Sequence, residues 1–116
     1  MKTGKHITYS EEEYLAYEAQ STARHEYIAG EIFAMTGASI RHNVIAGNLF
    51  AELRAHLKGT PCRALIESVK LRLRKEQSYF YPDLMVTCEE RLQALDSQQQ
   101  IVDAPVVIIE ILSPTT

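Results

Sequence analysis

The chain has 116 residues, of which 46% are apolar and 23% charged. This length allows one domain, which we expect to span residues 1–116, and this composition excludes a disordered chain. Apolar runs such as Val106–Ile109 are far too short to cross a membrane, so we expect no membrane partner.

The N-terminal residues and the two cysteines bear on cellular location. The basic start Met1–His6 leads into the acidic run Glu11–Glu13 rather than into an apolar stretch, which is unlike a signal peptide. Cys62 and Cys88 lack the spacing of a metal site or of a CxxC pair. We therefore expect a cytoplasmic protein with two reduced thiols.

The net charge of −3 is unevenly distributed along the chain. Residues 1–40 carry six acids and three bases, residues 41–80 carry three acids and eight bases, and residues 81–116 carry six acids and one base. A basic middle segment between acidic flanks suits a polyanionic partner. Solvated surface charge with no partner explains such runs as well.

The first half of the chain predicts a helix, a hairpin and a second helix, over residues 11–21, 26–35 and 40–58. Ser10 and Glu13 have the spacing of a capping box, which predicts where the first helix begins. Ala29-Gly30 separates two short apolar segments and predicts the turn of the hairpin. Apolar residues at helical spacing predict the second helix, which Gly59 would end.

The second half predicts strands over residues 69–73, 79–87 and 106–112, with a short helix over 88–96. Lys70, Arg72 and Arg74 alternate with apolar residues, which predicts a half-buried strand with a basic outer face. Pro82 suits the start or an edge of its strand. The last strand is apolar on both faces, as central strands of covered sheets are. The order of elements predicts a mixed α/β domain.

Two carboxylates carry most of the chemical information. Glu110 interrupts an otherwise apolar strand, where an isolated buried carboxylate would cost several kcal/mol, so we expect it to be paired, protonated or bound to a cation. Asp83 follows Pro82 at the opening of another predicted strand. Neighbouring strands can bring such groups together, as hard divalent cations require. A structural ion pair at Glu110 explains its position equally well.

Several blocks of the sequence resemble a bacterial family of candidate restriction endonucleases, long catalogued as a domain of unknown function, in the PD-(D/E)XK superfamily. A Pro-Asp pair followed by an acid in an apolar strand is similar to the first part of that superfamily's signature. The matching blocks are His25–Ile32, Met35–Ser39 with His42-Asn43, Tyr81–Asp83 and Ile109–Thr116. They cover nearly the whole chain and stand in the family's order. The resemblance implies a restriction-endonuclease-like mixed sheet flanked by helices.

The same resemblance implies a phosphodiesterase that uses Mg²⁺ or Mn²⁺ to cut DNA. Asp83 and Glu110 would be the metal ligands, with the backbone carbonyl of Ile111 as a further ligand. Such a metal would lower the pKa of its bound water and neutralise charge on the phosphate.

The resemblance also assigns supporting roles near these ligands. Glu31 or Glu26 would supply an additional acidic position, although both also suit a plain surface hairpin. His42 would orient a ligand or touch the phosphate, and an ordinary residue at a helix start is the alternative for it. The cations that would contact DNA phosphates are Lys70, Arg72 and Arg74.

The sequence departs from the signature at one position. Leu112 stands where the signature has a Lys two residues after the second acid. In the resembled family that Lys is thought to come from a helix beyond the Ser-Pro-Thr-Thr segment, and Lys70 is a possible substitute. The chain therefore resembles a C-terminally truncated member, and its exposed last strand predicts a homodimer or higher oligomer.

Two functions follow from these observations. The first is a metal-dependent DNA endonuclease, with or without activity in this chain. The second is a non-catalytic domain that binds nucleic acid or another partner, in which Glu110 is structural. Dependence on divalent ions separates the two, because both would use the basic strand.

Overall fold

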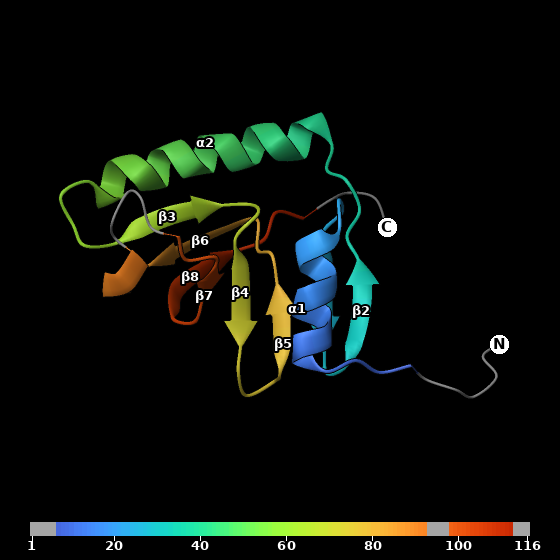
Figure 1. Ribbon diagram of the computed structural model, residues 1–116. Helices are drawn as coiled ribbons and strands as arrows, with labels where there is room; N and C mark the ends of the chain where they lie inside the picture. The colour runs from blue at the N-terminus through green and yellow to red at the C-terminus, as the bar shows by residue number, and fades with distance from the viewer. Residues whose placement is uncertain (1–6, 93–97, 113–116) are drawn as a thin grey trace. The chain divides into compact units, whose positions relative to one another are not determined.

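The structure is a computed structural model that describes residues 7–92 and 98–112 (Figure 1). The chain forms two compact units, the first within residues 1–36 and 72–80 and the second within residues 37–71 and 81–116. Each unit combines a helix with antiparallel strands, and the predicted α/β class is confirmed. Among the described residues, no helix has the length and apolar character needed to cross a bilayer.

The first unit consists of one helix and a small antiparallel sheet. Its elements are α1 (Glu11–Gln20), β1 (His25–Ile28), β2 (Glu31–Ala34) and β5 (Ser78–Phe80), with β1 paired to both β2 and β5. The predicted capping box is present, since the Glu13 N–H donates to Ser10 Oγ and the Ser10 N–H to Glu13 Oε1. Ala29 and Gly30 both have positive φ, as a tight hairpin turn requires.

Three tyrosines form the core of the first unit. Tyr14, Tyr27 and Tyr79 are almost completely buried, and the ring centroids of Tyr14 and Tyr27 lie 5.0 Å apart in a stacked arrangement. Their hydroxyls reach polar partners at the edge of this core: Tyr14 donates to the His25 carbonyl and Tyr79 to a Glu11 carboxylate oxygen. Burial raises the pKa of both Tyr27 and Tyr79, so these phenols stay protonated donors.

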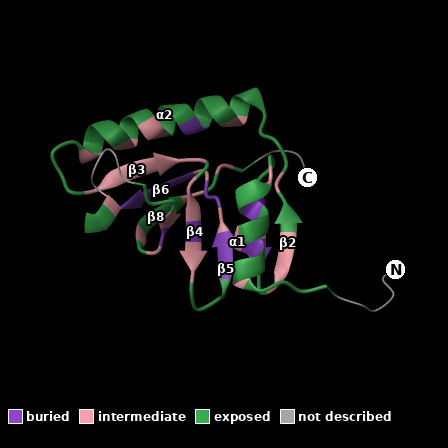
Figure 2. Cartoon of the chain, in the orientation of Figure 1, coloured by how far each residue is buried: buried purple, intermediate pink, exposed green. Residues whose placement is uncertain are grey.

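The second unit consists of a long helix and a three-stranded sheet. Its main elements are α2 (Ile40–Leu57), β3 (Arg63–Ile66), β6 (Leu84–Thr87) and β8 (Pro105–Ile109), with the antiparallel order β3-β6-β8. Helix α2 lies along β3 (Figure 1). All four residues of β6 are buried, which makes this central strand the core of the unit (Figure 2).

Three short elements complete the architecture. Strand β4 (Lys70–Leu73) contains the boundary between the two units, and its first two residues pair in parallel with β7 (Ile101–Val102). The predicted alternation of β4 is seen only at Leu71, which is buried, whereas Leu73 is half-buried like Lys70 and Arg72. A single 3₁₀ turn, η1 (Glu90–Leu92), occupies the start of the predicted helix over 88–96, and residues 93–97 lie outside the described part.

One prediction about a strand is wrong. The single strand expected over 79–87 is two strands, β5 and β6, separated at Pro82, which has no N–H to continue a ladder. The last strand has the apolar pattern of a covered central strand but was expected to be exposed in this chain. In its sheet β8 pairs with β6, and Val106, Val107 and Ile108 are exposed. Strands β3 and β7 were not predicted, because each is short and lacks strict alternation.

The expectation of two reduced thiols is also wrong, because Cys62 and Cys88 form a disulfide. The pairing follows from the sheet. Arg63 of β3 lies opposite Thr87 of β6, so the residues just outside that pair, Cys62 and Cys88, meet at the end of the same ladder. Sequence spacing could not reveal this contact, since strand β3 itself was not predicted.

Candidate active site

The β3–β6–β8 sheet fixes the backbone of Asp83. The Glu67 N–H donates to the Asp83 carbonyl across 3.1 Å, which extends the β3–β6 ladder by one step beyond its last strand pair. Asp83 therefore stands at the beginning of β6, where the ladder ends and a side chain can face away from the packed core. Its side chain is 20% exposed.

The same sheet brings Glu110 and Ile111 to Asp83. Leu84 lies opposite Ile109 in the antiparallel β6–β8 pair, so the residues one step outward, Asp83 and Glu110, are neighbours. The Asp83 N–H donates to Glu110 Oε1 at 3.4 Å, and the Ile111 N–H donates to Asp83 Oδ2 at 2.7 Å. Two carboxylates and one backbone segment thus converge at the end of two strands.

His42 joins this group from helix α2. Ser39 caps α2 by accepting a hydrogen bond from the His42 N–H, which fixes His42 in the first turn. The His42 Nε2 lies 3.1 Å from Asp83 Oδ2. An ionised carboxylate only accepts hydrogen bonds, so we assign the proton in this contact to Nε2. The other ring nitrogen, Nδ1, is buried without a hydrogen-bond partner among the described residues.

The environment of Glu110 differs from the sequence-based expectation. Glu110 was expected inside a buried strand, but it follows the last residue of β8 and is exposed. The expected desolvation cost is therefore absent, because the strand that carries Glu110 lies at the edge of its sheet. Its carboxylate nevertheless has a partner in the Asp83 N–H.

The other predicted site residues fall in both units. Lys70 belongs to the second unit, where its ammonium lies 5.8 Å from the centre of the Tyr81 ring. Tyr81 stands two residues before Asp83 in the sequence. Glu31 opens β2 in the first unit and is half-buried. Arg72 and Arg74 also belong to the first unit, the former half-buried and the latter exposed. Burial raises the pKa of Glu26 on β1.

Sequence reasoning missed two residues that shape this site. Ser39 was named only as the end of the matching block Met35–Ser39, yet its hydroxyl caps α2 and orients His42. A Ser directly before the apolar spacing of a helix is a recognised cap signal and could have identified it. Tyr81 was read as part of a motif, but no pattern in the sequence indicated that it would contact Lys70.

The donor atoms of this group fit a hard divalent cation in kind. Carboxylate oxygens of Asp83 and Glu110 and the carbonyl of Ile111 are the ligands that Mg²⁺ prefers, and Mg²⁺ commonly takes only one or two carboxylates and keeps several waters. Among the described residues, no three His, Cys, Asp or Glu side chains are grouped as ligands of one metal ion. The protein itself thus offers a two-carboxylate site.

Comparisons with known proteins agree on one family. The sequence profile of the Uma2 family, described as "Putative restriction endonuclease", matches residues 11–116. The chain is 36% identical over 107 residues to the uncharacterized protein slr1290 of Synechocystis sp., and 38% identical over 101 residues to sll1609 of the same organism.

A solved structure shows the same fold. A protein of Anabaena variabilis described as "a putative nuclease belonging to DUF820" superposes with a TM-score of 0.74 at 23% identity, covering 93% of this chain and 60% of the other. The alignments with the two Synechocystis proteins cover 92% and 87% of this chain but only 55% and 56% of theirs. The chain thus spans about half the length of the curated relatives it matches.

Proposed function

This chain belongs to the Uma2 family of restriction-endonuclease-like proteins, and from that premise we propose that it carries the metal-binding half of a DNA endonuclease of the PD-(D/E)XK type. One observation supports this proposal most directly. Asp83, Glu110 and Ile111 are joined by hydrogen bonds at the ends of adjacent strands, with His42 on the same Asp83 oxygen. Hard oxygen donors of this kind are the ones that phosphodiester hydrolysis with Mg²⁺ or Mn²⁺ uses.

The carboxylates have the central role in this proposal. Asp83 and Glu110, with the Ile111 carbonyl, would hold the ion, which when bound polarises the phosphate and lowers the pKa of its water. His42 and the Ile111 N–H both contact Asp83 Oδ2, so they hold the Asp83 carboxylate in one orientation. Among the described residues, the hydrogen bonds to this carboxylate use Oδ2, which leaves Oδ1 as the oxygen to face a cation.

DNA is the proposed substrate, and the basic residues of β4 and of the turn after it are its proposed contacts. Lys70, Arg72 and Arg74 would neutralise phosphates, so DNA binding should weaken as salt rises. The activity would belong in the cytoplasm, where the Cys62–Cys88 disulfide would be reduced. The uncovered edge of β8 would pair with a second copy to form a homodimer or higher oligomer.

The missing signature Lys limits what this chain does by itself. Leu112 stands at that position, so the cation that stabilises the transition state would come from the additional length of the family proteins. Removal of one such stabilising group costs about 10²–10³ in rate. We therefore expect this chain to bind the metal, and the longer family protein to turn over DNA.

Calorimetric titration of Mn²⁺ and Mg²⁺ into the 116-residue chain tests the carboxylate site. We expect binding by the wild type and at least a tenfold loss of affinity, about 1.4 kcal/mol, in Asp83→Asn and in Glu110→Gln. Glu52→Gln is the matched control, because Glu52 is an exposed acid of the same unit on α2. Circular dichroism of each variant establishes that it is folded.

The opposite result favours the second candidate function. A folded wild type that binds neither ion, or variants that bind as well as the wild type, would remove the metal from the proposal. The exposure of Glu110, and the presence of Leu112 where the signature has a Lys, would then point to a non-catalytic nucleic-acid-binding domain. Salt-dependent DNA binding that needs no divalent ion, in the wild type and in Asp83→Asn alike, would identify that function.

A further inference from the structure

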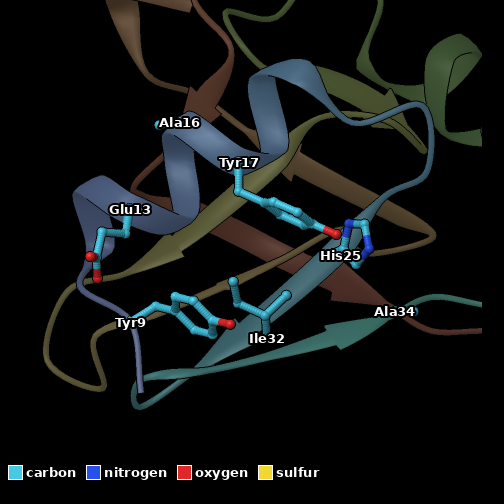
Figure 3. A pocket seen from close by; sticks show the side chains of 7 residues that line it. All are labelled: Tyr9, Glu13, Ala16, Tyr17, His25, Ile32 and Ala34. Atoms are coloured by element: carbon cyan, nitrogen blue, oxygen red, sulfur yellow. The ribbon is translucent and has the colours of Figure 1, made fainter. Parts of the chain in front are cut away.

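The first unit contains a pocket that takes no part in the proposed active site. Its volume is about 580 Å³, and it is lined by Tyr9, Glu13, Ala16, Tyr17, His25, Ile32 and Ala34 (Figure 3). All these residues lie in the N-terminal segment of the first unit. Helix α1 forms one wall and the β1–β2 hairpin the other, so both walls are fixed by regular secondary structure.

Two tyrosine rings give the pocket its aromatic character. Tyr17 extends from α1 toward His25 on β1, while Tyr9 lies beside Ile32 of β2 (Figure 3). The Tyr17 and His25 rings meet edge to face, with centroids 5.0 Å apart. Tyr9 and Tyr17 are 40% and 52% exposed, although each ring lies beside apolar side chains. Exposed ring faces on a concave surface favour a ligand that can replace water there.

The charges around the pocket decide which ligand suits it. Among the described residues that line it, Glu13 is the only acid and none is a Lys or an Arg. His25 forms two contacts with Glu18. The ring Nδ1 of His25 lies 3.0 Å from Glu18 Oε1, and the backbone N–H of His25 donates to Glu18 Oε2 at 2.7 Å. A second, buried carboxylate therefore stands next to the pocket. An anionic ligand such as a phosphate would be repelled here.

We propose that this pocket binds an organic cation, a guanidinium or ammonium group on an alkyl stem. The faces of Tyr9 and Tyr17 attract a cation through their ring quadrupoles, and Glu13 adds an opposite charge at the edge. Ile32, Ala16 and Ala34 provide an apolar surface for the stem. The proposal is independent of the proposed nuclease activity, because the residues that carry it belong to the other unit.

A pair of small probes of nearly equal shape tests the charge directly. Butylguanidinium is the cation, and butylurea is its neutral analogue. In titrations of the complete chain followed by side-chain NMR signals of Tyr17 and His25, we expect weak, millimolar binding of butylguanidinium. Butylurea should bind at least fivefold more weakly, since the ring faces and Glu13 respond only to the charge.

Conservative variants separate the contributions of the Tyr17 ring, the Tyr17 hydroxyl and the Glu13 carboxylate to binding. Tyr17→Leu should weaken butylguanidinium binding about two- to fivefold, whereas Tyr17→Phe, which keeps the ring face, should bind it as the wild type does. Glu13→Gln should weaken binding about two- to fivefold without loss of the helix cap, because Gln also satisfies a capping box at this position. Circular dichroism of each variant, compared with the wild type, is the control for folding.

Three outcomes would overturn the proposal. Equal affinity for butylguanidinium and butylurea would show that the pocket recognises shape rather than charge. Adenosine is titrated in the same way. If adenosine shifts the Tyr17 and His25 signals and butylguanidinium does not, the pocket binds a nucleobase rather than an organic cation. Absence of any shift at Tyr17 and His25, in a chain that circular dichroism shows to be folded, would show that the pocket takes no such ligand.

Discussion

Each unit of the molecule contains one histidine paired with a carboxylate, and the two pairs have almost the same length. His25 Nδ1 lies 3.0 Å from Glu18 Oε1 in the first unit, and His42 Nε2 lies 3.1 Å from Asp83 Oδ2 in the second. Their exposure differs. The Glu18 side chain is 3% exposed and that of Asp83 is 20% exposed. A distance alone therefore does not distinguish a structural pair from a functional one.

The partners of each carboxylate explain the difference. Both oxygens of Glu18 bind the single residue His25, through its ring and its backbone N–H, so the pair fastens the end of α1 to β1. Asp83 instead uses one oxygen for both His42 and Ile111, which come from two other elements of its unit. A carboxylate whose oxygens are both engaged stabilises the fold, whereas one with an oxygen left over can bind a ligand.

Loss of the disulfide is expected to have the largest effect on stability. Opening the Cys62–Cys88 bond, which closes a loop with a sequence separation of 26, should lower the free energy of unfolding by about 3 kcal/mol. Urea denaturation with and without reductant measures this loss, and a Cys62→Ala/Cys88→Ala variant should be insensitive to reductant. If the ring signals of His25 shift as much as those of His42 on reduction, the two pairs are not independent.

Substitution of the two carboxylates tests the comparison itself. Glu18→Gln should cost about 2 kcal/mol of unfolding free energy, because one buried donor of His25 loses its acceptor. Asp83→Asn should cost less than about 1 kcal/mol, since Asp83 is more exposed and the amide oxygen can still accept from the Ile111 N–H. Thermal unfolding of both variants measures the two losses of unfolding free energy and therefore their ratio. Equal losses would make Asp83 a structural residue like Glu18.

A third carboxylate, Glu89, should have a smaller effect on stability than Glu18, and one that depends on pH. Burial by itself would raise its pKa, but the backbone N–H groups of Ala104 and Asp103, together with Arg91 and Thr87, hold the pKa of Glu89 below its ordinary value. Because the pKa is lower in the folded than in the unfolded chain, the stabilisation is complete at neutral pH. It is lost as the pH falls through the acid range toward the folded pKa.

Glu89→Gln should remove that pH dependence. At pH 7 we expect a loss of about 1 kcal/mol. Both N–H groups donate to Glu89 Oε2, so the Gln oxygen can still accept them, but Gln lacks the negative charge that strengthens these bonds and pairs with Arg91. The difference from the wild type should shrink as the pH is lowered. Denaturation curves at a series of pH values measure it, and a difference that stays constant or grows in acid would contradict this account.

Much of the first unit was predictable because its signals are local. The capping box of Ser10 and Glu13 and the turn at Ala29-Gly30 each act within a few residues, and both structures formed as predicted. Helix α2 followed from its apolar spacing in the same way. The pairing of His25 with Glu18 was not predicted, since neither residue belongs to a pattern that indicates the contact.

The candidate site was accessible to sequence analysis only in part. The Pro-Asp pair and the acid at Glu110 identified two residues that the structure places side by side. The burial of Glu110 was predicted incorrectly, because an apolar run does not reveal whether its strand lies at the centre or the edge of a sheet. That difference depends on which other strands are present to pair with it.

The sequence by itself determined the helices, the hairpin, the family and the two carboxylates, because these depend on local spacing and short motifs. Only the tertiary structure decided which residues face each other across strands. The register of β3, β6 and β8 joined Cys62 to Cys88 and brought Ile111 to Asp83, and the packing of α2 brought His42 to the same oxygen. Strand register is set by contacts between segments far apart in the chain, so no single segment contains it.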